Sequence, residues 1–266
     1  MNLRIIAIVN QKGGVGKTTS AVNLSSGLAM LGKKTLLIDM DHQANTSASL
    51  GVRPLDAENT ICQLFIAPAE TFNISTIILE TMVDNLFLIP SHRNLSSVEL
   101  DLPYKTNLDN RIILRERLST VFNNYEFIII DCPPSLNLLA INCLTCAKEI
   151  LIPIKSEDKF SLDGIVQLHS VIASIKQNLN PGIEIMGYLP TFYSSATNLA
   201  KEILDQLKKQ FDKQVFEIVI GKRVHIAEAP IAHQPVQLYA KGSYGARVYN
   251  ELAKEVINRG KEKTIS

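Results

Sequence analysis

Glycines and lysines crowd one short stretch near the start of the chain, NQKGGVGKTT. Gly13, Gly14 and Gly16 lack a Cβ atom, so the backbone there can turn its N–H groups towards an anion. Lys17 can then reach the terminal phosphates of a nucleotide and stabilise their charge during catalysis, and the Thr18 hydroxyl can bind Mg²⁺. The residues predicted to bind the nucleotide are Lys12, Gly13, Gly14, Val15, Gly16, Lys17, Thr18 and Thr19.

The stretch departs from the usual phosphate-binding loop in one respect. The usual spacing places its first glycine where this chain has Gln11, and the next position carries a second lysine, Lys12. Lys17 and Mg²⁺ already serve the terminal phosphates within one chain. We therefore expect Lys12 to point away from its own nucleotide and to act as a catalytic residue on the nucleotide of a second copy, as an arginine finger does elsewhere. A solvated surface lysine is the alternative interpretation.

Carboxylates follow two further apolar segments. Asp131 ends the run FIIID and is predicted to hold Mg²⁺, through water. Asp39 and Asp41 lie two residues apart in LLIDMDHQAN, so on an extended chain they share one face. We expect Asp39 to orient the magnesium shell and Asp41 to position the attacking water as a catalytic residue. Helix capping by Asp41 is the alternative. The predicted metal-site residues are Thr18, Asp39 and Asp131.

Short apolar runs alternate with longer segments of helical periodicity. The runs are rich in Ile, Leu and Val with little alternation, which is typical of parallel strands buried on both faces. Strands are predicted at 3–9, 34–40, 85–91, 126–132, 149–155 and 183–190, and helices at 17–31, 93–101, 109–123, 136–146, 162–178, 197–210 and 243–259. Short helices and loops are expected over 51–84.

This alternation predicts an α/β, doubly wound, mostly parallel sheet with helices on both faces, the fold of P-loop NTPases. We expect a single domain over residues 1–266. Ligands of such sheets bind at the carboxyl ends of the strands. The glycine-rich loop and the two acidic segments each follow a predicted strand, so the fold would bring all three to one edge.

Composition excludes several classes of protein. Of the 266 residues, 46% are apolar and 20% charged, and the formal net charge is +1, as in an ordinary globular protein without a strong field. Four cysteines are too few for a disulfide scaffold, and Cys143 with Cys146 is interpreted as a packed pair on an apolar helix. No apolar run approaches the length of about 18 residues that spans a membrane, and no signal peptide is recognised. A cytoplasmic location is expected.

The stretch KGGVGKTT resembles the deviant Walker A motif of the ParA, Soj and MinD ATPases, whose hallmark is the lysine before the glycines. Other stretches are similar to the short ParA/Soj branch, which partitions chromosomes and plasmids. They are LLIDMDHQANTS, FIIIDCPPSLNLLAINCLTCA, LIPIKSEDKFSLDGI, GYLPTFYSSATNLAKEI and AEAPIAHQPVQLYAKGSYGARVYNELAKEV. The resemblance covers nearly all of 3–257 and is weakest at 51–125.

The resemblance implies an ATPase with Mg·ATP as cofactor. Such proteins form homodimers around two ATP molecules and bind DNA non-specifically in that state, and a ParB/Spo0J-type partner stimulates slow hydrolysis. The family roles of the signature lysine, the catalytic aspartate and the Walker B aspartate fall on Lys12, Asp41 and Asp131. A nucleoid-associated location is implied, and the N-terminal operator-binding domain of the long branch is expected to be absent.

Two departures from the family pattern affect these expectations. His42 stands where the family usually has proline and is interpreted as a tolerated loop residue, with an effect on hydrolysis as the alternative. Ala196 and His225 stand where members often carry DNA-binding arginines. The candidate DNA contacts here are Lys201, Lys222, Arg223 and Arg247. In the adenine-pocket segment 221–230, Gly221 and Arg223 replace the usual proline and asparagine, so no base contact is assigned.

The sequence leaves three other functions of related proteins as alternatives. A MinD-like, membrane-associated division-site ATPase is the main alternative, but the tail NELAKEVINRGKEKTIS has few large apolar residues, so no stable membrane association is expected. A metal-cluster carrier would need Cys143 and Cys146 as ligands. A nucleotide switch that scarcely hydrolyses ATP is the third.

Overall fold

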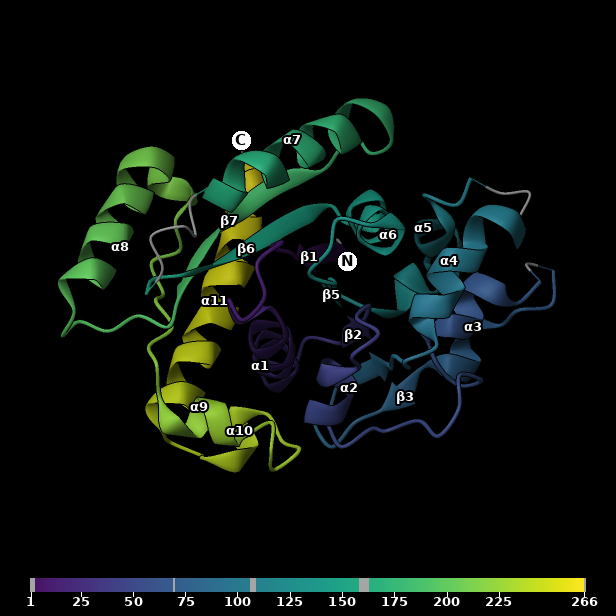
Figure 1. The fold of residues 1–266 in the computed structure, drawn as a ribbon. Helices are drawn as coiled ribbons and strands as arrows, with labels where there is room; N and C mark the ends of the chain where they lie inside the picture. Colours follow the sequence, from purple (N-terminus) through teal and green to yellow (C-terminus); the bar gives the residue numbers. More distant parts are fainter. Residues whose placement is uncertain (1–2, 69, 106–108, 158–162, 266) are drawn as a thin grey trace.

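The computed structural model describes residues 3–68, 70–105, 109–157 and 163–265. A seven-stranded sheet crosses the molecule with helices on both faces, in the strand order β3-β4-β2-β5-β1-β6-β7 (Figure 1). Neighbouring strands run parallel except for β3 and β4. The predicted α/β, doubly wound sheet is therefore confirmed.

All six predicted strands form. Their bounds are β1 Arg4–Ile8, β2 Thr35–Asp39, β4 Leu86–Ile89, β5 Phe127–Asp131, β6 Glu149–Lys155 and β7 Glu184–Thr191. The additional strand β3 (Leu79–Glu80) pairs antiparallel with β4, inside the segment where the sequence predicts only short helices and loops. Two residues carry no periodicity, so pattern analysis could not detect this strand.

Two apolar layers sandwich the sheet. On one face lie α1 (Lys17–Met30), α10 (Val236–Tyr239) and α11 (Tyr244–Ile265), where Leu24 and Leu252 are completely buried. The other face is covered by α3 (Ile61–Ile66), α4 (Leu95–Lys105), α5 (Ile113–Leu118), α6 (Leu138–Cys146), α7 (Asp163–Asn178) and α8 (Asn198–Phe211). Burial on both sides explains why the central strands are continuous apolar runs.

The long predicted helices agree with the structure, with shifted ends. Helix α11 extends six residues beyond the predicted end at 259, to Ile265, and α4 begins and ends later than the predicted 93–101. Residue 162, the predicted start of α7, lies outside the described residues. The segment 109–123 is not one helix, because α5 gives way at Ser119 to a 3₁₀ turn.

Three short helices have no counterpart in the prediction. These are α2 (Asn45–Ser49), α9 (Val224–Glu228) and α10. Each spans little more than one turn, too short for an apolar face to repeat. Within the described part of the chain, no helix has both the length and the apolar character needed to cross a lipid bilayer.

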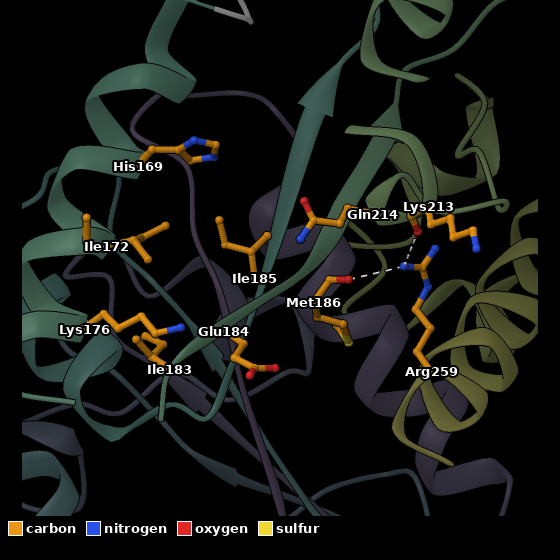
Figure 2. Close-up of a pocket in the computed structure, with 11 residues that line it drawn as sticks. His169, Ile172, Lys176, Ile183, Glu184, Ile185, Met186, Lys213, Gln214 and Arg259 are labelled. Atoms are coloured by element: carbon orange, nitrogen blue, oxygen red, sulfur yellow. Dashed lines mark hydrogen bonds between the residues drawn. The ribbon is translucent and has the colours of Figure 1, made fainter. Parts of the chain in front are cut away.

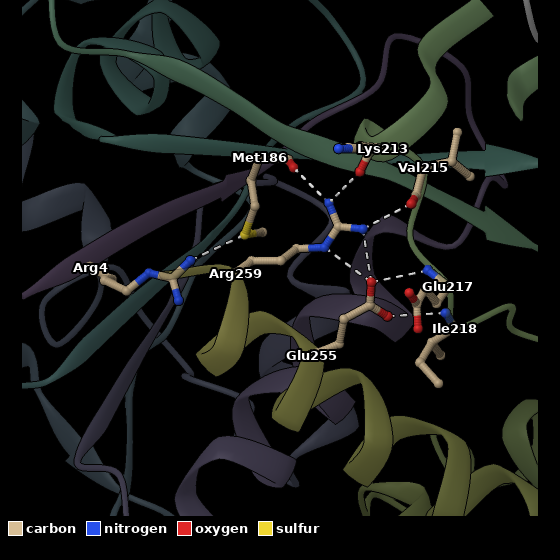
Figure 3. Close-up of polar contacts among 8 residues, drawn as sticks. All are labelled: Arg4, Met186, Lys213, Val215, Glu217, Ile218, Glu255 and Arg259. Carbon is tan, nitrogen blue, oxygen red and sulfur yellow. Dashed lines mark hydrogen bonds and ion pairs between the residues drawn. The ribbon is translucent and has the colours of Figure 1, made fainter. Parts of the chain in front are cut away.

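Arg259 of α11 fixes the end strand of the sheet (Figure 3). Its guanidinium donates to the carbonyls of Met186, Lys213 and Val215 at 2.8–3.2 Å, and twice to the carboxylate of Glu255. All five N–H groups of the arginine are thereby used. The Glu255 carboxylate also accepts the backbone N–H groups of Glu217 and Ile218, at 3.0 Å each. The last helix is thus tied to β7 and to the segment that runs beside it.

Candidate functional site

The glycine-rich loop connects β1 to α1 and opens onto a cavity of about 830 Å³. Gly14 and Gly16 have φ of 70° and 89°, a left-handed conformation that a residue with a Cβ atom adopts at a cost. Helix α1 begins directly at Lys17, so its free N–H groups and positive dipole end face the same space. This combination of turn and helix start is an anion-binding site.

Lys17 is buried beneath the loop. Its Nζ donates to the Lys12 carbonyl at 3.2 Å, and burial lowers its pKa, against the opposing effect of charges that include Asp131 and Asp41. A phosphate group in the cavity would offer Nζ a charged acceptor in place of a neutral carbonyl, which is the stronger hydrogen bond. The Lys17 side chain is therefore positioned for phosphate, and the Lys12 carbonyl binds its ammonium group when no phosphate is present.

Asp131 ends β5 and is buried beside the start of α1. Thr18 Oγ1 donates to its Oδ2 at 2.8 Å, and Thr46 Oγ1 donates to the same oxygen at 2.6 Å. The other oxygen, Oδ1, is buried and has no hydrogen-bond partner among the described residues. Thr46, on α2, is a contact that the sequence reasoning missed, because nothing in the pattern connects residue 46 with residue 131.

Asp39 ends β2, the neighbour of β5, and lies opposite Asp131 in the strand register. Its Oδ2 accepts the backbone N–H and the hydroxyl of Ser47, at 2.9 and 2.7 Å, and its Oδ1 accepts the N–H of Asp41 at 3.2 Å. Both oxygens of Asp39 therefore orient the loop that carries Asp41. Its predicted part in the magnesium shell stays a prediction.

The two buried carboxylates repel each other's charge. Burial is the main cause that raises the pKa of Asp39 to about 7, and Asp131 raises it further. Burial likewise raises the pKa of Asp131 to about 6, against the lowering effect of the two threonine hydroxyls and Lys17. A cation beside these groups would remove the penalty.

Magnesium fits this donor set. The orphaned Oδ1 of Asp131 and the Thr18 hydroxyl are oxygen ligands of the kind that Mg²⁺ prefers. Among the described residues, no three His, Cys, Asp or Glu side chains gather so as to hold a metal ion. A magnesium ion here would therefore complete its shell with water and phosphate oxygens, which is its usual behaviour with nucleotides.

Asp41 lies on the wall of the same cavity, partly exposed. Its Oδ1 accepts the backbone N–H of Gln43 at 3.0 Å and lies 3.6 Å from Nδ1 of His42. It caps no helix, because α2 begins after Ala44, which makes no side-chain cap. Its position towards the cavity is compatible with holding a water molecule, and that role stays a prediction.

A smaller pocket of about 270 Å³ adjoins the loop at Gly16 and Thr19. Its remaining lining is Thr191, Phe192, Ile220, Gly221, Lys222, Arg223, Ile226, Ala227, Pro230 and Tyr249. Most of this lining is apolar, as the pocket of a flat base would be. The sequence analysis pointed to 221–230 for this role but missed Phe192, which directly follows β7.

The candidate DNA residues are exposed but do not form one free patch. Lys222 and Arg223 line the smaller pocket, where Arg223 lies 4.7 Å over the ring of Tyr244 and Lys222 is 3.5 Å from Glu157. Lys201 projects from α8 and Arg247 from α11, where it donates to the Gly242 carbonyl at 2.6 Å. Their contact with DNA stays a prediction.

A further cavity of about 720 Å³ lies away from this chemistry, between α7 and the edge of β7 (Figure 2). Arg259 reaches its rim with all of its donors already occupied, and the floor is apolar, with Ile172, Ile185 and Met186. Charged side chains line it as well, namely Lys176, Glu184 and Lys213, but its described lining contains no glycine and so no counterpart to the glycine-rich phosphate loop. Cys143 and Cys146 are both free and buried, which confirms the packed interpretation.

Asp131→Asn is expected to stabilise the nucleotide-free protein at about pH 8, on the order of 2 kcal/mol in the free energy of unfolding. The raised pKa of Asp131 means that its charge opposes folding above a pH of about 6, whereas the penalty disappears below about pH 4, where the group is protonated in both states. Denaturant unfolding at both pH values measures this. Asp84→Asn, at an exposed turn, is the matched control. A variant no more stable than the parent at the higher pH would contradict the assigned burial penalty.

The strand, the glycine turn, the buried lysine and the paired carboxylates define a P-loop nucleotide-binding protein with an additional lysine ahead of its glycines. The chain matches the family described as "AAA domain" over residues 3–185. It is 40% identical to the sporulation initiation inhibitor protein Soj of Bacillus subtilis, over 97% of this chain and 99% of that one. It is 39% identical to the chromosome-partitioning ATPase Soj of Treponema pallidum, over 96% and 98%. The chain belongs to the Soj/ParA family of partitioning ATPases.

Solved structures agree with this assignment. Cobyrinic acid a,c-diamide synthase from Mycobacterium smegmatis, with bound ADP and magnesium, superposes with a TM-score of 0.83 at 27% identity, over 97% of this chain and 96% of that one. The cell division ATPase MinD of Pyrococcus furiosus gives 0.75 at 28% identity, over 96% and 98%. The P-loop NTPase fold is thus confirmed.

Proposed function

We propose that this chain binds Mg·ATP, dimerises around it, and binds DNA in that state to partition a chromosome or plasmid. The observation that carries the proposal is the meeting of the Lys12-containing loop, Asp41 and Asp131 at one edge of the sheet, in a chain that aligns over its length with Soj. The partition names of the curated relatives favour this function over division-site positioning.

The two pockets can accept the two ends of a nucleotide. The larger cavity holds the loop, Lys17 and Thr18, which suits the phosphates. The smaller pocket begins at Gly16 and Thr19 and continues into an apolar lining, which suits the base. In this arrangement Phe192 touches both spaces, since it lines both pockets. Cleavage of the terminal phosphate would proceed by a water molecule held by Asp41, with Mg²⁺ supplying charge stabilisation.

The place of Lys12 in the loop supports the proposal of a dimer. Its carbonyl already accepts Nζ of Lys17, and its N–H is bound to Oδ1 of Asn10 at 2.9 Å, so the backbone of this residue is fixed at the loop. A second copy facing this loop would bring its nucleotide within reach of the Lys12 side chain. We therefore propose a symmetric homodimer with two nucleotides between the copies. A ParB/Spo0J-type partner would stimulate hydrolysis.

DNA binding is proposed for the ATP dimer, in the cytoplasm at the nucleoid. Reversing the charge of Lys222 and Arg223 together to Glu is expected to abolish the ATP-dependent gel shift of a random duplex, because affinity depends on the number of phosphates neutralised. The assay compares ATP, ADP and no nucleotide, at low and raised salt. The parent should shift DNA only with ATP and lose affinity steeply with salt.

Two controls make this test specific. ATP binding must be measured in the same variant, since both residues line the smaller pocket. Reversal of Arg111 and Lys148, which are exposed elsewhere, makes the same change in net charge. Retained DNA binding in the first variant, or equal loss in the second, would count against the assigned surface.

A further inference from the structure

A cavity of about 480 Å³ borders the space of the phosphate loop, and we call it the basic cavity. Its polar lining consists of His42, Gln43, Arg53, Ser91, His92 and Arg93. These side chains come from the loop after Asp41, from the segment after α2 and from the loop after β4. The basic cavity and the phosphate cavity share Ala48 and Arg53 in their walls, so the two cavities adjoin.

The basic cavity is positively charged. No carboxylate belongs to its lining as far as the described residues extend. The Arg93 guanidinium makes no ion pair with any described residue, and the one hydrogen-bond partner of the Arg53 side chain among those residues is Nε2 of His233, at 3.4 Å. Nδ1 of His42 lies 3.6 Å from Asp41, and the positive charge of the lining is that of the two arginines. Such a concave, basic lining attracts anions.

One buried donor inside the basic cavity lacks an acceptor among the described residues. Ser91 is completely buried and its N–H donates to Oγ of Ser47 at 2.9 Å, but its own Oγ has no hydrogen-bond partner among the described residues. A buried hydroxyl without a partner costs free energy that a bound acceptor would recover. Nδ1 of His92 accepts the N–H of Asn94 at 3.3 Å, so a neutral ring carries its proton on Nε2 and presents a second donor.

An arginine fork, a hydroxyl and an imidazole N–H together match the tetrahedral oxygens of a phosphate. The basic cavity starts one residue after Asp41, the residue proposed to hold the attacking water. We propose that it is a second oxyanion site, which receives the inorganic phosphate cut from ATP before that phosphate reaches the solvent. The inference rests on the proposed ATP hydrolysis for its supply of phosphate, and on the cavity itself for binding.

Inorganic phosphate is favoured over a phosphodiester of DNA. The doubly charged form of free phosphate gains more from two arginines than a singly charged diester does. The buried Ser91 hydroxyl is also reached more readily by a small ion than by a phosphate flanked by sugars. Dimethyl phosphate and a short oligonucleotide distinguish the two sources.

The test measures phosphate binding by isothermal titration calorimetry on the full chain. The protein is first saturated with Mg²⁺ and AMPPNP, a non-hydrolysable ATP analogue, so that the phosphate loop is occupied and cannot bind the titrant. Saturable binding of inorganic phosphate is expected. Arg93→Ala should weaken it about tenfold, through loss of a charged hydrogen-bond pair, and Ser91→Ala should weaken it to a smaller extent. Arg111→Ala, an exposed arginine outside the cavity, should leave binding unchanged.

Two results would overturn the proposal. One is the absence of saturable phosphate binding in the loaded parent protein, or equal binding in the Arg93 variant. The other is dimethyl phosphate or the oligonucleotide binding as tightly as phosphate, which would assign the cavity to nucleic acid. ATP hydrolysis and dimerisation are assayed separately on the parent, so failure of the proposed function is distinguishable from failure of the basic cavity.

Discussion

Lys12→Ala is expected to keep ATP binding and to lose ATP hydrolysis by about a thousandfold or more, the range that a charge supplied across a dimer contributes elsewhere. In the structure, the backbone of Lys12 serves its own loop, because its carbonyl accepts Nζ of Lys17 and its N–H is bound to Asn10. The alanine variant retains both backbone contacts. The loop should therefore fold and bind nucleotide normally, while the charge that would act on the second copy's phosphates is gone.

The measurement pairs a nucleotide-binding assay with hydrolysis under single-turnover conditions. Lys254→Ala, an exposed lysine on α11 that pairs with Glu251, is the matched control and should hydrolyse ATP at the parent rate. Mixing Lys12→Ala with a variant that binds no nucleotide of its own provides a sharper test. In such a mixed dimer the Lys12→Ala copy holds ATP and the other copy supplies Lys12, so the proposed exchange predicts that hydrolysis is restored. Hydrolysis at the parent rate in Lys12→Ala would refute the exchange of lysines, and loss of ATP binding would assign Lys12 to its own nucleotide.

Asp41→Ala is expected to produce a long-lived ATP dimer whose hydrolysis is slower by about a hundredfold to ten-thousandfold, the usual contribution of a general base. Asp41 lines the phosphate cavity but makes no contact with Asp131 or Thr18 that is needed for the magnesium site. Binding of Mg·ATP should therefore survive. Among the described residues, the short-range polar contacts of its carboxylate are the N–H of Gln43 and the ring of His42, so the loss to folding should be small.

Size-exclusion chromatography with ATP, followed by analysis of the bound nucleotide, measures this outcome. The parent should elute with ADP after incubation, and Asp41→Ala should elute as a dimer with intact ATP. Asp84→Ala removes an exposed acid and should behave as the parent. Rapid turnover by the Asp41 variant would show that another group positions the water. A parent protein that binds ATP but scarcely hydrolyses it would favour the nucleotide-switch alternative.

The parts of the site that follow directly from a strand could be predicted from the sequence. Asp39 and Asp131 end apolar runs, and Lys17 starts a helix behind three glycines, so the fold had to bring them to one edge. That Asp39 and Asp131 lie opposite each other could not be predicted, because the order of β2 and β5 in the sheet is set by the topology. The sequence pattern indicates that two strands exist but not that they are neighbours.

The parts that depend on short elements could not be predicted. Thr46 and Ser47 bind the two buried carboxylates from a five-residue helix, which leaves no period in the sequence. The same holds for the basic cavity, where Arg53 and Arg93 are forty residues apart and meet only because the loops after α2 and β4 adjoin. Tertiary contacts of single polar residues are set by packing, which local pattern does not record.

The Arg259 network at the last strand has a consequence for how copies of this protein can meet. An end strand normally offers its bare carbonyl and amide row as a template on which another chain's strand can add. Here a guanidinium and the stretch around Val215 occupy that border, and the Met186 carbonyl is already taken. Addition of another chain's strand along this border is thereby blocked, so the proposed dimer would have to form through a different surface.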